Sequence, residues 1–181
     1  DIVEKILAEI QIRQKSGTLQ DSPYIYSTLI RLNGDNIEKV ESTYSQAVAK
    51  GYGDHPHIVT VYLHCLSKNG YIDKMEDLLR KMPTWSTNIY NVLLVFHGKR
   101  NEYEKVYKLL EKMKTEQIEF NEVTYGTLIT IFGHWKDPKR ILDVLNWIKS
   151  SGSANITANF YSILASAYSR LGDAEGVSEA W

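Results

Sequence analysis

Apolar side chains recur along this chain at positions i, i+3 and i+4, the spacing that gathers them on one face of an α-helix. A first cluster of this kind occurs five times, and its copies start at Tyr26, Val59, Tyr90, Tyr125 and Tyr161. These starts lie 33, 31, 35 and 36 residues apart. A second cluster follows each first one, starting at Val40, Met75, Val106, Ile141 and Val177. The pattern predicts repeated pairs of amphipathic helices.

Turn-forming residues separate the two clusters of each pair, in segments 33–36, 68–70, 99–101, 136–138 and 171–173. Asp137 before Pro138 is typical of a helix N-cap followed by proline in the first turn. Gly51 and Gly152 follow second clusters, where a left-handed residue commonly ends a helix. No segment alternates apolar and polar residues over the length of a strand between hairpin turns, so the chain is predicted to be all-α.

A single helix pair cannot bury its own apolar face, so neighbouring pairs are expected to stack into a solenoid whose first helices line one side. The repeat boundaries divide residues 1–181, as one helical array, into units of 31–36 residues. Complete units are predicted at 23–55, 56–86, 87–121 and 122–157. Residues 1–22 are expected to hold the second helix of a preceding unit, and residues 158–181 a truncated unit.

Charge and composition narrow the class of protein. Lys and Arg total 21 against 22 Asp and Glu, which excludes a strongly basic histone-like binder but leaves room for a local basic stripe. No run of 18 apolar residues exists, so no membrane span and no membrane partner are expected. The chain ends at Trp181 within an apparent helix, so we expect it to be a piece of a longer protein.

The chain offers little for catalysis or metal binding. Cys65 is the single cysteine, which excludes an intramolecular disulfide, and its place in the helical rhythm favours a small buried residue over a nucleophile. His55, His57 and His64 match no established spacing of metal ligands. No nucleotide-binding or hydrolase fingerprint occurs. We therefore expect no enzyme, no cofactor, no metal and no small-molecule substrate.

Residues 87–121 resemble a complete pentatricopeptide repeat. They open with Tyr90 and Asn91, carry Lys99 before the turn, and continue with the apolar second cluster that ends at Met113. Residues 81–91 are similar to the junction that ends the family's short, 31-residue variant, and residues 167–174 are similar to another stretch of such repeats. The tetratricopeptide and ankyrin patterns are absent. The resemblance covers nearly the whole chain and implies a right-handed α-solenoid of stacked helix-turn-helix repeats.

The resemblance also implies binding of single-stranded RNA, about one base per repeat. In that family the base is read by the residue after the repeat tyrosine and by the last residue of the unit. The corresponding pairs are Ser27 with His55, Thr60 with Ser86, Asn91 with Asn121, and Gly126 with Thr157. Only the two asparagines form a well-populated family combination, one that leans to pyrimidines, and we expect both to have solvent access. Gly126 has no side chain that could read a base. The alternative for each pair is a solvated polar residue on the groove wall.

A position three residues before each first reader flanks the base in the family. It is occupied here by Tyr24, His57, Asn88, Val123 and Asn159. A tyrosine or histidine ring stacked tightly on a base contributes about 1–3 kcal/mol. The alternative for Tyr24 is ordinary packing against the next repeat.

A third feature is electrostatic and does not depend on the family. Cations stand at the ends of successive first helices, each eight residues after a first reader, at Lys68, Lys99, His134 and Arg170. One cation per unit suits a phosphate backbone. Acidic residues such as Glu102 are expected on second helices, where they would not cancel this stripe. The alternative is that helix C-termini favour cations in any case.

The resemblance implies a non-catalytic RNA-binding module that acts in organellar RNA processing, stability or translation, in a mitochondrion or alternatively a chloroplast. A second hypothesis is a helical-repeat scaffold for proteins or for the mitoribosome, without base-specific readout. The poor reader pairs in three of the four units favour that scaffold. In a third hypothesis the repeats are the targeting arm of a nuclease or an editing factor.

Overall fold

The computed structural model describes residues 22–151 and 157–172, together with isolated positions before residue 21. Within these ranges the secondary structure is helical and no strand occurs, which confirms the all-α prediction. Most of the predicted helix over residues 1–22, the expected helix end at Gly152 and the last cluster, from Val177, lie outside the described residues. None of the described helices has both the length and the apolar character needed to cross a membrane.

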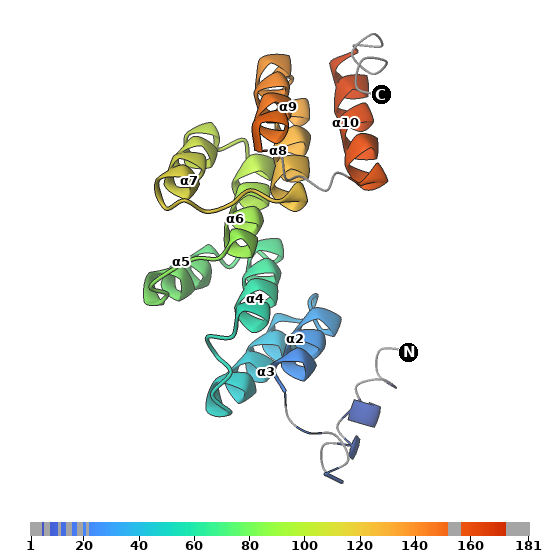
Figure 1. Cartoon of the computed structure of the whole chain (residues 1–181). Helices are drawn as coiled ribbons and strands as arrows, with labels where there is room; N and C mark the ends of the chain where they lie inside the picture. Colours follow the sequence, from blue (N-terminus) through green and yellow to red (C-terminus); the bar gives the residue numbers. More distant parts are fainter. Residues whose placement is uncertain are drawn as a thin grey trace. The chain divides into compact units, whose positions relative to one another are not determined.

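The helices alternate along the chain as first and second members of pairs (Figure 1). The first helices are α2 (Pro23–Leu32), α4 (Pro56–Lys68), α6 (Thr87–Lys99), α8 (Glu122–His134) and α10 (Ala158–Leu171). The second helices are α3 (Ile37–Ala49), α5 (Ile72–Lys81), α7 (Tyr103–Thr115) and α9 (Pro138–Ser151).

The helices pack into two compact units, Asp1–Thr84 and Trp85–Trp181. In the first unit, α2 packs against α3 and α4, and α4 packs against α3 and α5. In the second unit, α8 packs against α6, α9 and α10, and α6 also packs against α7. First helices therefore contact first helices inside each unit, so side chains from consecutive pairs meet on one surface.

Local sequence explains where several helices begin and end. Pro23 and Pro56 stand in the first turns of α2 and α4, where a missing amide hydrogen costs nothing. The Asp137 carboxylate accepts a bond from the backbone nitrogen of Arg140 at 3.2 Å, which confirms the predicted cap of α9. Gly51 follows α3 with a φ of +79°, a left-handed conformation that glycine adopts without strain.

The recurring apolar positions form the core. The cluster-opening residues of the four predicted complete units, Tyr26, Val59, Tyr90 and Tyr125, are all buried, as are their second-helix counterparts Val40, Met75, Val106 and Ile141. Cys65 is also buried and its thiol lies 3.8 Å from the carbonyl oxygen of Ile30. Burial raises the pKa of this thiol, so Cys65 behaves as the small core residue that its position predicts.

Two glycines set the closeness of the first helices in the second unit. A β-carbon built on Gly98 would lie 2.5 Å from Cγ1 of Ile131, and one built on Gly133 would lie 2.8 Å from Cβ of Ala167. Side chains at these positions would push α6 from α8 and α8 from α10. Each glycine directly precedes a predicted phosphate contact, Lys99 or His134, so the close packing also determines how near these two side chains lie to the neighbouring helix.

Candidate nucleic-acid interface

A groove of about 610 Å³ crosses α6, α8 and α10 in the second unit. Predicted site residues from three categories line it: the phosphate contacts Lys99 and His134, the reader pair Gly126 and Thr157, and the base-flanking Val123 and Asn159. Thr127, Thr130 and Ile163 also line the groove, and the sequence analysis did not single them out. Helical spacing could have identified them, because each lies about one helical turn or less from Gly126 or Asn159 and so shares a helix face with a predicted site residue.

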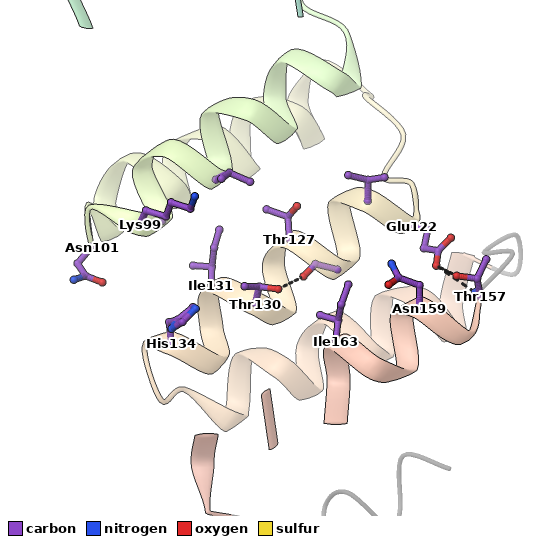
Figure 2. Close-up of a pocket in the computed structure, with 14 residues that line it drawn as sticks. Lys99, Asn101, Glu122, Thr127, Thr130, Ile131, His134, Thr157, Asn159 and Ile163 are labelled. Carbon is purple, nitrogen blue, oxygen red and sulfur yellow. Dashed lines mark hydrogen bonds between the residues drawn. The ribbon is translucent and has the colours of Figure 1, made fainter. Parts of the chain in front are cut away.

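The two ends of the groove differ in charge, as Figure 2 shows. Lys99 and His134 lie together at one end, and both are exposed. Within the described part of the chain, neither side chain forms an ion pair or a hydrogen bond. Glu122 lies at the other end, where its carboxylate accepts bonds from the Thr157 hydroxyl and, at 3.3 Å, from the Thr157 backbone nitrogen. The groove thus has a cationic end open to a ligand and an acidic end already engaged.

The structure brings the predicted pair Asn91 and Asn121 together. Nδ2 of Asn91 lies 3.4 Å from Oδ1 of Asn121. The expectation that both have solvent access is wrong for Asn91, which is only 6% exposed. Its position on α6 faces the neighbouring helix start rather than solvent. Asn121 is exposed, and its Oδ1 also caps α8 by accepting bonds from the backbone nitrogen and the hydroxyl of Thr124.

Two of the remaining predicted reader pairs, Ser27 with His55 and Thr60 with Ser86, belong wholly or partly to the first unit. The Ser27 hydroxyl is buried and donates to the carbonyl oxygen of Tyr24 at 3.0 Å. His55 directly precedes α4 and its Nδ1 is buried without a hydrogen-bond partner. Thr60 and Ser86 belong to different compact units. Ser27 therefore has no free hydroxyl hydrogen to offer a base.

Gly126 has no side chain, and Cδ1 of Ile163 lies close to the place where its β-carbon would stand. The hydroxyl of its predicted partner, Thr157, is bonded to Glu122. This reader pair therefore offers a base no free polar side chain from either position.

Three rings gather at the start of α2 and α4 in the first unit. The Tyr24 ring centroid lies 5.1 Å from that of His57 and 5.8 Å from that of His55, and the two histidine rings are 5.6 Å apart. Tyr24 is nevertheless 61% exposed. This ring therefore packs against the next predicted unit, as the alternative interpretation has it, and still offers a face to solvent. Asn88 and Val123 are exposed near the starts of α6 and α8.

The predicted cationic stripe is not uniform. Lys68 forms an ion pair with Asp35, a turn residue between α2 and α3, and this bond raises the pKa of the ammonium group. The expectation that acidic residues leave the stripe uncancelled is therefore wrong at Lys68, because an acid in the turn reaches it. Lys99, His134 and Arg170 are exposed and form no ion pair within the described residues. Three of the four predicted phosphate contacts are therefore open to a ligand.

A charged cluster organises the turn that follows Lys99. His97 Nδ1 lies 2.5 Å from a carboxylate oxygen of Glu102, and Arg100 and Lys105 approach the same carboxylate at 3.0 and 3.4 Å. The bond from His97, followed by those from Arg100 and Lys105, lowers the pKa of Glu102 to about 2, while burial acts in the opposite direction. Glu102 is therefore occupied by these partners and leaves Lys99 unneutralised.

Among the described residues, no group of three histidine, cysteine or acidic side chains lies close enough to hold a metal ion. What the arrangement offers is hydrogen bonding, stacking and positive charge.

Known proteins share repeats and a fold with this chain. A model of the PPR repeat family matches residues 86–134, and a model of the PPR repeat matches residues 58–86. No curated protein sequence matches the chain. Among solved structures, the pentatricopeptide repeat protein PPR10 from maize is 25% identical over 88% of this chain, with a TM-score of 0.64. The match covers 23% of the maize chain, so this chain spans about a quarter of that protein's length.

Two further solved structures share the fold. PPR10 in complex with an 18-nt psaJ RNA element is 18% identical over 98% of this chain and 25% of its own, with a TM-score of 0.61. The nuclear proteinaceous RNase P 2 from A. thaliana is 15% identical over 92% of this chain and 38% of its own, with a TM-score of 0.56. The repeat matches and the shared helical-repeat fold together show that this chain contains pentatricopeptide repeats over residues 58–134.

Proposed function

We propose that the chain is a non-catalytic module that binds single-stranded RNA across its first helices. The observation that carries this proposal is the pair Lys99 and His134. They stand 35 residues apart at equivalent ends of α6 and α8, share one groove and have no counter-ion among the described residues. Cations repeated at the same place in successive repeats suit successive phosphates, which supply a sequence-independent part of RNA affinity.

The same groove supplies surfaces for a base. Val123 is 61% exposed and Asn159 is exposed on the next first helix, so the base-flanking positions of two successive repeats border the groove. We assign base flanking to these residues and to Tyr24, His57 and Asn88, and base reading to Asn91 with Asn121. Ser27, His55 and Thr60 are weaker readers, because the Ser27 hydroxyl is engaged and both His55 Nδ1 and Thr60 Oγ1 are buried. Ser86 is exposed and is retained as the reader paired with Thr60.

The comparisons support this class of function without specifying a target. The maize protein complex shows that a protein of this fold binds an 18-nt RNA, but at 18% identity the likeness extends to the fold alone. The organellar setting, with RNA processing, stability or translation as the process, follows from the family resemblance. We place the protein in a mitochondrion, with a chloroplast as the alternative, and imaging of the tagged full-length protein tests this placement.

The binding proposal is tested by selecting sequences that the chain retains from a pool of randomised single-stranded RNA, at several salt concentrations. We expect retention that weakens as salt rises, and a loss of affinity when Lys99 and His134 are both replaced by Gln. The matched control is Lys108→Gln, which removes an exposed cation from the second helix α7. Equal loss in both variants would show that the first-helix cations have no special role.

A scaffold function is the second candidate, and a specific observation favours it. Ser27 and Thr157 use their hydroxyls inside the protein, and Gly126 has no side chain. Retention of folded ribosomal RNA or of protein partners, without enrichment of any single-stranded sequence, would favour the scaffold. The likeness to RNase P is a likeness of fold alone.

A further inference from the structure

Two aromatic rings lie beside the cationic end of the groove. The ring centroid of Tyr103, the first residue of α7, lies 4.2 Å from that of Trp135, which directly follows α8. Trp135 is also held by a hydrogen bond, because its Nε1 donates to Oδ1 of Asn101 at 3.0 Å. Asn101 lines the groove at the same end as Lys99 and His134 (Figure 2). The two rings are therefore fixed to the cationic end of the groove.

Packing holds this ring pair in place and leaves part of it open to solvent. Phe132 and Tyr107 also approach Trp135, with ring centroids at 5.8 and 6.4 Å, and Trp135 is partly buried. Tyr103 nevertheless keeps 49% of its surface exposed. Because its neighbour already orders this ring, a planar group that stacks on it removes little further conformational freedom. Tyr103 and Trp135 thus form a preformed stacking surface.

The turn between α8 and α9 adds a lysine at an unusual backbone position. A residue with left-handed backbone, at a φ between +54° and +77°, follows each of α4, α6, α8 and α10. These residues are Gly70, Asn101, Lys136 and Gly172. Glycine and asparagine adopt this conformation readily, whereas lysine does so at a cost in free energy. The chain therefore keeps a lysine directly after Trp135 at a position that the backbone would favour for glycine, which points to a function of its side chain.

The acidic side chains of the two turns have other partners. The Glu102 carboxylate is bound by the three basic side chains described above. The Asp137 carboxylate caps α9 through the backbone nitrogen of Arg140. Lys136 is exposed and, like Lys99, forms no ion pair among the described residues. Two unpaired lysines therefore stand in the turns that carry the ring pair.

We propose, resting on the proposed function, that Tyr103 and Trp135 form an accessory stacking site for one nucleobase of the RNA strand beyond the cationic end of the groove, and that Lys136 contacts a phosphate beside that base. The site lies in two turns, outside the first-helix positions assigned above to base reading and base flanking. Every base has a π face, so the site adds affinity without preferring a base. A strand is a better occupant than a protein segment, because the rings adjoin the groove and two unpaired lysines.

The first test measures affinity for the RNA recovered in the selection described above, with each variant checked as folded by circular dichroism. Tyr103→Phe keeps the ring and should bind like the wild type. Tyr103→Ala removes the exposed stacking surface and should lower the affinity at least about fivefold, the lower end for stacking of a base on an aromatic side chain. The base preference should stay the same in both. Equal affinity of Tyr103→Ala and the wild type, with RNA still bound, would overturn the proposal.

Tyr71→Ala is the matched control. It removes another exposed tyrosine, which directly precedes α5 and has Lys74 over its ring at 5.3 Å. We expect its affinity for RNA to equal that of the wild type. A loss as large as that of Tyr103→Ala would show that exposed turn tyrosines act in general, and not through the pair with Trp135, which would overturn the assigned site.

Lys136→Gly separates the charge from the stability of the turn. Glycine suits the backbone at this position, so urea denaturation should show the variant to be at least as stable as the wild type. Its affinity for RNA should fall, and the slope of log affinity against log salt should decrease by about 0.7, the value for one phosphate contact on a single strand. An unchanged slope would overturn the phosphate contact of Lys136.

Ultraviolet crosslinking, followed by mass spectrometry of the peptides, locates the base directly. We expect a nucleotide attached to the peptide that carries Tyr103 or Trp135. Crosslinks confined to the first helices, in a chain that retains RNA, would overturn this site and leave the proposed function standing. A wild-type chain that retains no single-stranded RNA would overturn both. Loss of a protein partner in Tyr103→Ala, with RNA affinity unchanged, would assign the rings to protein docking instead.

Discussion

Gly133 of α8 lies directly against Ala167 of α10, so that an added β-carbon would stand 2.8 Å from Cβ and 3.1 Å from Cα of that alanine. Because one of these atoms is backbone, α10 itself would have to move. We expect Gly133→Ala to lower the free energy of unfolding by about 1–3 kcal/mol, measured by urea denaturation.

Gly126→Ala is the matched control on the same helix. Its added carbon would meet only the terminal Cδ1 of Ile163, at 3.1 Å, and a flexible methyl group can shift. Alanine also favours helix over glycine by about 1 kcal/mol, so this variant should be neutral or slightly stabilised. An equal loss in both variants would show that the close approach of α8 and α10 is not what Gly133 provides.

Glu102→Gln should change how stability depends on acid. The folded pKa of Glu102, about 2, lies below its usual 4.5, so protons bind more strongly to the unfolded chain. The stabilisation is complete above pH 4.5 and is lost as the pH falls towards 2. Thermal unfolding across this window should show the wild type losing more stability than the variant. Glu104→Gln, at an exposed glutamate without an ion pair among the described residues, should follow the wild type.

Lys68 and Lys99 should contribute differently to RNA binding. Lys99→Gln is expected to reduce the slope of log affinity against log salt by about 0.7, the value for one phosphate contact on a single strand. Lys68→Gln should reduce it less, because Asp35 already pairs with this ammonium group. Releasing Lys68 with Asp35→Asn should raise RNA affinity. Identical salt slopes in the two lysine variants would contradict this difference.

Gly126→Asn tests whether a reader can be added to the fourth predicted unit. The Asn side chain should give that repeat a base preference, but Cδ1 of Ile163 lies 3.1 Å from the added β-carbon. Combining it with Ile163→Val removes that methyl group and should give the larger gain in the RNA selection. Ile163→Val alone is the control. If the double variant gains no preference at any position, the assignment of Gly126 to the reader position is wrong.

The helices could be predicted from sequence because each depends on local information. The apolar spacing around Tyr90 and Val106 defines two helical faces, and the turn chemistry at Asp137 marks a helix start. The predicted helix pairs required no knowledge of distant contacts. How the pairs divide into two compact units depends on the balance of contacts between repeats, which no local pattern encodes.

The site was harder to predict because it depends on which side chains meet. Asn91 follows a core tyrosine on the sequence, and only the packing of α6 beside the start of α8 shows that it is buried. The pairing of Lys68 required knowing that the turn containing Asp35 lies beside the end of α4. By contrast, Asn121 followed three residues later by Thr124 is a recognisable capping pattern. Asn121 was predicted as a base reader, and its role as the N-cap of α8 was not predicted.

Polar links that span about one repeat length recur in both compact units. Asp35 pairs with Lys68 and Glu41 with Lys74, 33 residues apart, the Asn69 amide donates to the carbonyl of Gly34, 35 residues away, and Trp135 donates to Asn101, 34 residues away. The links span 33, 34 and 35 residues, so each depends on the turn that carries it and not on one fixed repeat length. Side chains on the groove can be exchanged without breaking these links. Changes of ligand are therefore accessible by substitution while the contacts between neighbouring repeats stay in place.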